Sequence, residues 1–389
     1  MSAGMLPILP GATLGVLGGG QLGRMFVHAA QAMGYFTAVL DPDPASPAGR
    51  VSHHHIQSAY DDPDGLRQLA GLCAAVTTEF ENVPAVALAA LAGQCTVSPA
   101  ARAVAVAQNR AEEKAHFTAC GVPCAPYTVI ETPEQLASAD PSLFPGILKT
   151  SRMGYDGKGQ ARVQTPAELT TAWDAMGRAP CVLEQRLHLA LECSVIVARG
   201  ADGACVHLPL QRNLHRDGIL AVTEVYEENM PLALMQQALA AAKSIADELQ
   251  YIGVLCVEFF VLEDGRLVVN EIAPRPHNSG HYSVDACDVS QFELQVRTLA
   301  GLPLTPPHQH SAAIMLNLLG DLWFAGGETQ QEPAWTQVLA LPGTHLHLYG
   351  KEQARHGRKM GHLNVTAASA AAAHSTALQA AALLGLPAF

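Results

Sequence analysis

The sequence has little positive charge, no cysteine framework and no long uninterrupted apolar run. Its 389 residues contain 23 Lys and Arg against 35 Asp and Glu, a net charge of −12. Nucleic acids and anionic membranes attract basic surfaces, so we expect neither as a main partner. Nine cysteines without framework spacing predict reduced, buried thiols in a cytoplasmic protein. No apolar stretch of about 18 residues is free of Gly or Pro, and the N-terminus lacks a positive flank, so no membrane span or secretion signal is expected.

Alternating strand and helix patterns predict an α/β fold of three domains. Strands at 13–17 and 36–40 flank a helix at 24–33, which makes a Rossmann-like βαβ unit. A helix at 105–120, strands at 144–150, 160–163, 181–185 and 192–198, and a helix at 232–249 follow. The Pro-rich stretch 302–308 predicts a linker to a last domain with strands at 312–318 and 345–349 and an Ala-rich helix. The expected domains are 1–105, 106–306 and 307–389.

Two glycine loops could bind phosphate. Gly18-x-Gly20-x-x-Gly23 follows the first strand, with Asp41 near the position of a ribose-binding acid, which matches the dinucleotide fingerprint. The same loop can hold another phosphate at the helix N-terminus, or can be a tight turn only. The second loop, 150–159, begins after Lys149 and contains Lys158; it is no Walker A motif, and a flexible turn remains open as a reading.

Two carboxylates are expected to face each other on a β-hairpin. Asp264-Gly265 is a two-residue turn signal, and the resulting register pairs Phe259 with Asn270 and Glu258 with Glu271. Like charges directly opposite on a sheet are unfavourable, so the pair requires a compensating cation. Oxygen ligands suit Mg²⁺, which takes one or two carboxylates plus substrate phosphates. The hairpin therefore predicts half of a nucleotide–metal site, and a solvated hairpin edge is the alternative reading.

The order of these features resembles the ATP-grasp ligases, and among them the N5-carboxyaminoimidazole ribonucleotide synthetase family. The resemblance runs from about residue 13 to 365, and its motifs are 17–25, 78–84, 154–160, 213–220, 270–281 and 357–364. It implies an ATP-grasp fold of α+β lobes with an N-terminal Rossmann-like domain and a small C-terminal domain. It also implies a cytoplasmic homodimer of purine biosynthesis.

The implied reaction joins ATP, bicarbonate and 5-aminoimidazole ribonucleotide to give ADP, phosphate and the N5-carboxylated ribonucleotide through carboxyphosphate. Metal and donors would neutralise the transferring phosphate. The residues implied for ATP are Arg110, Lys149, Met153, Gly154, Tyr155, Asp156, Gly157, Lys158, Gly159, Glu184, Gln185, Arg186, Leu187, Glu192, His215, Asn270 and Glu271. Those implied for Mg²⁺, with Mn²⁺ as an alternative, are Glu258 and Glu271. Arg275, His277, Asn278 and Lys351 are implied as catalytic, the first three at bicarbonate or carboxyphosphate. Gln21, Tyr155, Asp156, Lys351 and Arg358 are implied at the ribonucleotide.

Other functions stay open on the sequence alone. A NAD-dependent Rossmann oxidoreductase would use the first glycine loop but leaves the carboxylate pair unexplained. A nucleotide-sensing module would keep the ATP site without Arg275, His277 and Asn278, and a sibling ATP-grasp ligase would use formate or another carboxylate. Met153 and the pair Gln211-Arg212 depart from the family pattern. The Met153 change removes no ligand, and the role of the strand end at Gln211 is left undecided.

Overall fold

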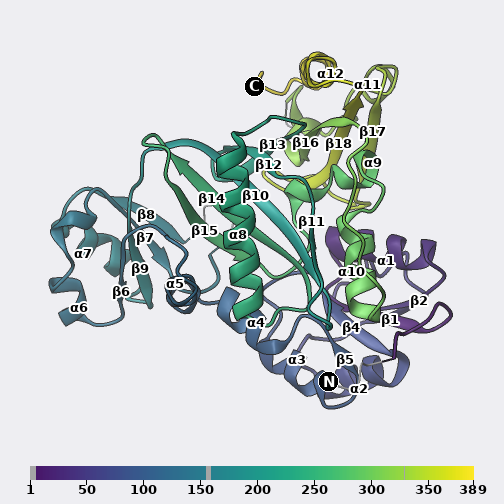
Figure 1. The fold of residues 1–389 in the computed structure, drawn as a ribbon, viewed down its shortest axis with the longest axis horizontal. Coiled ribbons are helices and arrows are strands. Elements are labelled where there is room, and N and C mark those ends of the chain that lie inside the picture. Colours follow the sequence, from purple (N-terminus) through teal and green to yellow (C-terminus); the bar gives the residue numbers. More distant parts are fainter. Residues whose placement is uncertain (1–5, 155–158, 328) are drawn as a thin grey trace.

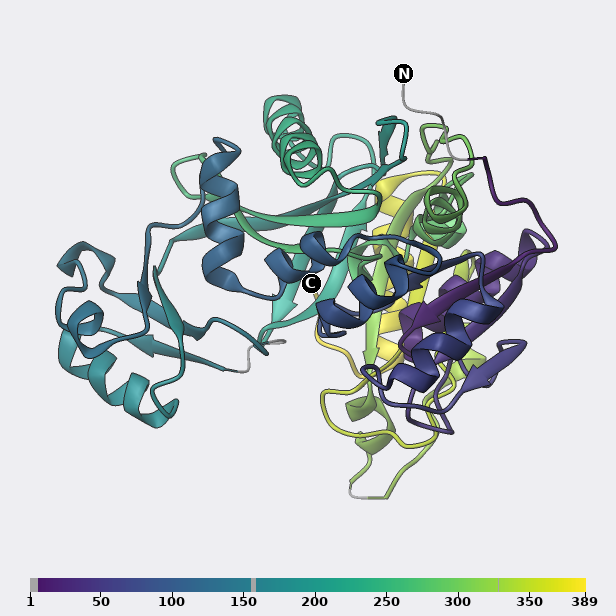
Figure 2. The same ribbon diagram turned by 90° about the horizontal axis from the view of Figure 1, so that it is seen from below.

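The computed structural model describes residues 6–154, 159–327 and 329–389. Their strands form three sheets. Figure 1 shows a small lobe at the left, a large central sheet and an N-terminal layer at the lower right. Figure 2, from below, separates the N-terminal layer from the small lobe. The described part of the chain holds no helix long and apolar enough to cross a bilayer. All nine cysteines are free thiols, five buried and four half-buried.

The N-terminal sheet is parallel, with strand order β3-β2-β1-β4-β5. Helix α1 packs on one face with α10, which comes from much later in the chain, and α2, α3 and α4 pack on the other. The bounds are β1 Thr13–Leu17, α1 Gln21–Ala32, β2 Phe36–Leu40, β3 His54–Ile56, α2 Pro63–Leu72, β4 Ala75–Thr78, α3 Ala85–Ala92, β5 Thr96–Val97, α4 Ala101–Ala107 and α10 Gln291–Ala300. The two predicted strands are confirmed, whereas α1 begins at Gln21, directly after the glycine loop.

The small lobe is a four-stranded antiparallel sheet in the order β6-β9-β7-β8. Leu148, Leu183 and Trp173 are among the side chains of its own core. Its elements are β6 Tyr127–Ile130, α6 Pro133–Ala137, η1 Pro141–Leu143, β7 Gly146–Thr150, β8 Gln160–Val163, α7 Pro166–Ala175 and β9 Cys181–Gln185. The lobe thus packs its own apolar residues while presenting β7 and β9 toward α5.

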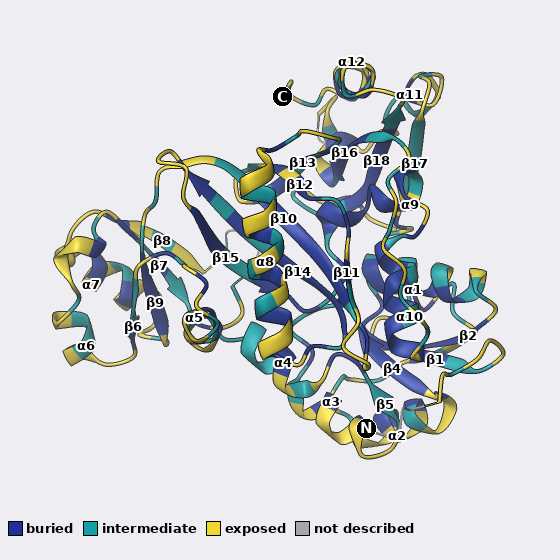
Figure 3. Cartoon of the chain, in the orientation of Figure 1, coloured by how far each residue is buried: buried dark blue, intermediate teal, exposed yellow. Residues whose placement is uncertain are grey.

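The large sheet has the order β15-β14-β10-β12-β13-β16-β18-β17, with β11 paired to β10. Figure 3 shows its central strands buried, with the outer side of α8 exposed. The remaining elements are α5 Arg110–Ala119, β10 Leu189–Arg199, β11 Cys205–His207, β12 Gln211–Arg216, β13 Ile219–Val225, α8 Leu232–Glu248, β14 Gly253–Leu262, β15 Leu267–Ala273, η2 Asn278–Gly280, α9 Ser283–Ala286, β16 Ala312–Leu319, η3 Gly320–Phe324, α11 Trp335–Val338, β17 Thr344–Leu348, β18 Lys359–Ala367 and α12 Ala370–Leu383. The C-terminal strands extend this sheet instead of forming one of their own, because β16 pairs with β13.

The single helix predicted at 105–120 is wrong. Asn109 interrupts it with an extended backbone (φ −128°, ψ 108°), and its side chain accepts a hydrogen bond from the amide of Ala111, which caps α5. Asn is a strong N-cap residue because its side-chain oxygen satisfies a free amide of the first turn. The break places Arg110 at the start of α5, where it can reach the large sheet.

Candidate active site

The carboxylate hairpin forms, but its turn differs from the prediction. Leu262 pairs with Arg266, so the loop contains three residues, and Gly265 has the left-handed φ of +83° that glycine tolerates. This shifts the register by one, and Phe259 faces Val269 instead of Asn270. A β-bulge at Asn270 shifts it back, so Glu258 does face Glu271. The predicted pairing is confirmed because two departures from the simple register cancel.

His277 and Arg110 each lie against one of the two carboxylates. His277 Nε2 lies 3.0 Å from Glu258 Oε1, and Arg110 Nη1 lies 3.2 Å from Glu271 Oε2. Burial alone would raise the pKa of Glu258, but the hydrogen bond with His277 outweighs burial and lowers that pKa to about 2. Glu258 is thus poised as an anion. The oxygen-only donor set fits Mg²⁺, and Glu271, whose side chain is 41% exposed, is open to a ligand.

A second cluster joins the small lobe to α5. The Glu184 carboxylate, 4% exposed, lies 3.0 Å from Lys149 Nζ and 3.2 Å from Lys114 Nζ. Burial by itself raises the pKa of Glu184, yet Lys149 and Lys114 outweigh it and lower the pKa to about 2. Helix α5 therefore contacts both lobes, through Lys114 to β9 and through Arg110 to β15. Two lysines around one carboxylate leave a net positive charge, which suits a polyphosphate.

Of the other residues implied for ATP, Glu192 and His215 contact each other on the large sheet, whereas the Gln185 side chain lies away from the lysine cluster. Glu192 Oε2 on β10 is 2.6 Å from His215 Nδ1 on β12; burial lowers the pKa of His215, but this hydrogen bond outweighs burial and raises it. Gln185 lies on the opposite face of β9 from Glu184, where its amide donates to the carbonyl of Ser142, so its side chain is not in the lysine cluster. Arg186 and Leu187 follow β9 directly.

The second glycine loop is described only at its ends. Met153 is 71% exposed, and Gly154 is half-buried. Gly159 has φ +70°, and a Cβ there would lie 2.6 Å from Thr150 Oγ1, so a side chain could not be placed without strain. Tyr155, Asp156, Gly157 and Lys158 lie outside the described residues.

The predicted bicarbonate residues follow β15 and receive a partner from the N-terminal domain. Arg275 Nε donates to Glu81 Oε2 at 2.5 Å, and Asn278 is buried at the start of η2. Burial raises the pKa of Glu81, but the charge of Arg275 outweighs it and lowers the pKa to about 2. Glu81 belongs to the motif 78–84, but the sequence alone assigned this residue no role. Only the fold reveals that Glu81 orients Arg275.

Residues from the two ends of the chain meet at the predicted ribonucleotide site. Lys351 Nζ donates to Gln21 Oε1 at 2.8 Å and to the carbonyl of Lys359 at 2.6 Å. Burial, followed by the charge of Arg358, lowers the pKa of Lys351 to about 8. Arg358 donates to the carbonyl of Gln353 at 2.8 Å. Gln21, Lys351 and Arg358 thus lie close together, and their role at the ribonucleotide stays a prediction.

Carboxylates occupy the glycine amides of the first glycine loop. The amide of Gly19 donates to Asp41 Oδ2 at 2.6 Å, and the amides of Gly20 and Gly23 donate to the two oxygens of Glu79 at 2.5 and 2.7 Å. Glu79 is buried, and burial raises its pKa. Its carboxylate occupies the N-terminus of α1, where a dinucleotide would place its pyrophosphate. This removes the main support for the oxidoreductase alternative.

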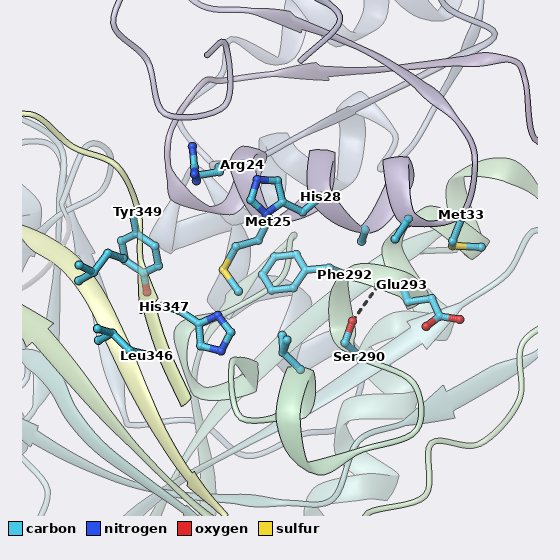
Figure 4. A pocket seen from close by; sticks show the side chains of 14 residues that line it. Arg24, Met25, His28, Met33, Ser290, Phe292, Glu293, Leu346, His347 and Tyr349 are labelled. Carbon is cyan, nitrogen blue, oxygen red and sulfur yellow. Dashed lines mark hydrogen bonds between the residues drawn. The ribbon is translucent and has the colours of Figure 1, made fainter. Parts of the chain in front are cut away.

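A cavity of about 550 Å³ lies beside the ribonucleotide region, between α1, α10 and β17. Figure 4 shows Arg24 and His28 on one wall, His347 and Tyr349 on another, and Phe292 between them. None of the predicted site residues lines it. Tyr349 lies between it and Lys351, whose ammonium is 5.6 Å from the centre of that ring.

The chain has two α+β lobes joined by α5, and the large sheet carries a carboxylate pair. This is the arrangement of ATP-grasp ligases. Family models agree along the chain: a ribonucleotide synthetase preATP-grasp domain matches residues 11–108, an ATP-grasp domain 115–292, and a phosphoribosylaminoimidazole carboxylase C-terminal domain 313–376. The chain belongs to the N5-carboxyaminoimidazole ribonucleotide synthase family.

Relatives and solved structures are similar over nearly the whole chain. N5-carboxyaminoimidazole ribonucleotide synthase of Brucella melitensis is 43% identical over 91% of this chain and 96% of its own, and that of Bacillus subtilis is 39% identical over 92% of each. An ADP complex of N5-carboxyaminoimidazole ribonucleotide synthetase has a TM-score of 0.89 at 40% identity, covering 97% of this chain and 98% of its own. The Aspergillus clavatus enzyme with ADP and 5-aminoimidazole ribonucleotide has a TM-score of 0.86 at 32% identity, covering 96% and 98%.

Proposed function

We propose that this protein uses ATP and bicarbonate to carboxylate the amine of 5-aminoimidazole ribonucleotide. Bicarbonate attacks the γ-phosphorus of ATP, so that ADP leaves and carboxyphosphate forms. The amine then takes the carboxyl carbon, phosphate leaves, and a proton is released. The observation that carries this proposal is that His277 lies against the carboxylate pair of β14 and β15, with Arg275 just beyond the end of β15. This arrangement offers anionic ligands for a metal beside hydrogen-bond donors for a small oxyanion.

The proposed ATP site lies between the small lobe and the large sheet. Lys149 and Arg110 supply positive charge for the phosphates, and Glu184 fixes the direction of Lys149. Glu192 and His215 hold each other on neighbouring strands of the large sheet, where they would contact the nucleoside. Glu258 and Glu271 would hold Mg²⁺ or Mn²⁺, with Asn270 beside them, and a bound divalent ion would neutralise the transferring phosphate.

The proposed acceptor site is built from the N- and C-terminal parts of the chain. Lys351 and Arg358 would bind the phosphate of the ribonucleotide, and Gln21 would hold Lys351 in place. Arg275 presents a planar guanidinium that can bind bicarbonate or carboxyphosphate through two parallel hydrogen bonds. Asn278 adds an amide donor nearby. Glu81 holds Arg275, so a bound bicarbonate would share or replace that contact.

The direct test is an ADP-release assay in which bicarbonate and the ribonucleotide are withheld in turn. We expect full turnover only with both, and formation of the carboxylated product. Replacing bicarbonate with formate tests the sibling ligase that activates another carboxylate. ADP release that depends on neither bicarbonate nor the ribonucleotide would refute the proposed function.

We also propose three domains at 1–105, 106–306 and 307–389, a homodimer, and a cytoplasmic location, in keeping with the family resemblance. Sedimentation velocity on the purified protein tests the assembly, because a monomer at micromolar concentration contradicts the proposed dimer. Limited proteolysis near 302–308 tests the second boundary. The pairing of β13 with β16 predicts that fragments cut there stay associated.

A further inference from the structure

A continuous row of buried polar side chains lies behind His277. It crosses the large sheet from Thr223 on β13 through Asn213 on β12 and Ser194 on β10 to Ser279 in η2. All four residues are at most 7% exposed. The links measure 3.0 Å from Thr223 Oγ1 to Asn213 Oδ1, 2.8 Å from Asn213 Nδ2 to Ser194 Oγ, and 2.8 Å from Ser194 Oγ to Ser279 Oγ. Burying a row of polar groups this long costs free energy unless each group has a hydrogen-bond partner.

The row ends on the imidazole of His277. Ser279 Oγ lies 2.9 Å from His277 Nδ1, and the amide of Ser279 approaches the same nitrogen at 3.3 Å. On the other side of the ring, Nε2 lies 3.0 Å from Glu258 Oε1. The amide of Ser279 can only donate to Nδ1, and an ionised carboxylate can only accept from Nε2. The proton of the neutral ring is therefore on Nε2.

This tautomer gives every link one direction. The Ser279 hydroxyl donates to His277, so the Ser194 hydroxyl must donate to Ser279. Gln211 Oε1, 3.0 Å from Ser194 Oγ, shares that same hydrogen. The Asn213 amide donates to Ser194, and Thr223 donates to the Asn213 oxygen. The bonds thus run from Thr223 to the carboxylate without reversal, the arrangement in which hydrogen bonds strengthen one another.

We propose that Ser279, Ser194, Asn213 and Thr223 are positioning residues that hold His277 as the Nε2–H tautomer and thereby fix one oxygen of Glu258. With Oε1 held by His277, the other oxygen of Glu258 stays free to face a cation. The inference rests on the proposed function only for the roles of Glu258 and His277. It also gives Gln211, a departure from the family pattern, a place beside the row.

The tautomer can be measured without substrate, nucleotide or metal. Nitrogen-15 NMR of the histidine-labelled, metal-free protein distinguishes a protonated from an unprotonated ring nitrogen, and the His277→Gln variant identifies the signals. We expect Nε2–H in the parent and in Ser244→Ala, a control whose hydroxyl donates to the Cys120 carbonyl away from the row. Ser194→Ala should give a mixture of tautomers. An Nδ1–H ring in the parent, or an unchanged ring in Ser194→Ala, would overturn the proposal.

Kinetics separate positioning from folding. Outer partners of metal-binding groups typically affect activity about tenfold to a hundredfold. We expect Ser194→Ala to lower kcat by about tenfold with the ribonucleotide KM unchanged. Thr223→Val should lower kcat less, and Thr223→Ser, which keeps the hydroxyl, should restore it. An equal loss of kcat in Thr223→Val and Thr223→Ser would show a packing effect and would overturn the proposed role of the row. If the Nε2–H tautomer were fixed but turnover did not depend on bicarbonate, the proposed function would be refuted. The positioning role of the row would then still hold.

Discussion

The buried Glu184 cluster allows a stability prediction with a worked magnitude. Replacing Glu184 by Gln keeps the shape but leaves Lys149 and Lys114 without their counter-charge. The pKa of Glu184 is about 2 in the folded protein against an ordinary 4.5. At about 1.4 kcal/mol per pH unit, this difference is worth about 3 kcal/mol at neutral pH. Breaking a buried pair by removing one partner costs about 3–5 kcal/mol in other proteins, which agrees.

Urea unfolding of the parent and Glu184→Gln at pH 7 measures this loss. The exposed Glu131→Gln in the same lobe is the matched control, and we expect a change within about 0.5 kcal/mol there. Combining Glu184→Gln with Lys114→Met should recover part of the stability, because it removes one uncompensated buried charge. If Glu184→Gln were as stable as Glu131→Gln, the ion cluster would contribute nothing and the reasoning would fail.

The pH dependence has a definite sign. Because the folded-state pKa of Glu184 is depressed, its contribution is fully present above pH 4.5 and is lost as pH falls toward 2. The difference between parent and Glu184→Gln should therefore stay constant from pH 7 to about 4.5 and shrink below. A difference that grew on acidification would contradict the assignment.

Three further predictions concern the reaction. Glu258→Gln or Glu271→Gln should cut turnover by orders of magnitude without unfolding the protein, and isothermal titration should show weaker Mg²⁺-nucleotide binding; near-normal turnover of both would refute the metal site. Arg275→Ala should keep ATP affinity but lose bicarbonate-dependent ADP release, so collapsed ATP binding with intact bicarbonate dependence would mean a wrong role. Lys351→Ala should raise the ribonucleotide KM about tenfold to a hundredfold by loss of a charge-assisted bond, while the exposed neighbour Arg355→Ala should match the parent; equal behaviour of the two would move the phosphate site elsewhere.

Local pattern was sufficient where one segment carries the whole signal. The strands at Thr13–Leu17, Phe36–Leu40 and Cys181–Gln185 were predicted with their observed bounds, because apolar runs end there at polar or glycine-rich turns. Patterns failed where a single residue decides. Asn109 divides an otherwise continuous helical pattern, and the bulge at Asn270 corrects a register that the turn alone would have shifted.

The sequence by itself determined the family and the two-lobed α/β fold, because motif order and strand alternation are local. The pairing of Glu258 with Glu271 was also predicted, but it holds only because the three-residue turn and the bulge at Asn270 cancel. Only the tertiary structure decided which side chains contact the glycine loop and the charged site residues. Glu79 reaches the glycine loop across 56 positions, Glu81 reaches Arg275 across 194, and Lys351 reaches Gln21 across 330. Such contacts depend on how sheets and helices pack, and neither periodicity nor spacing encodes a partner hundreds of residues away.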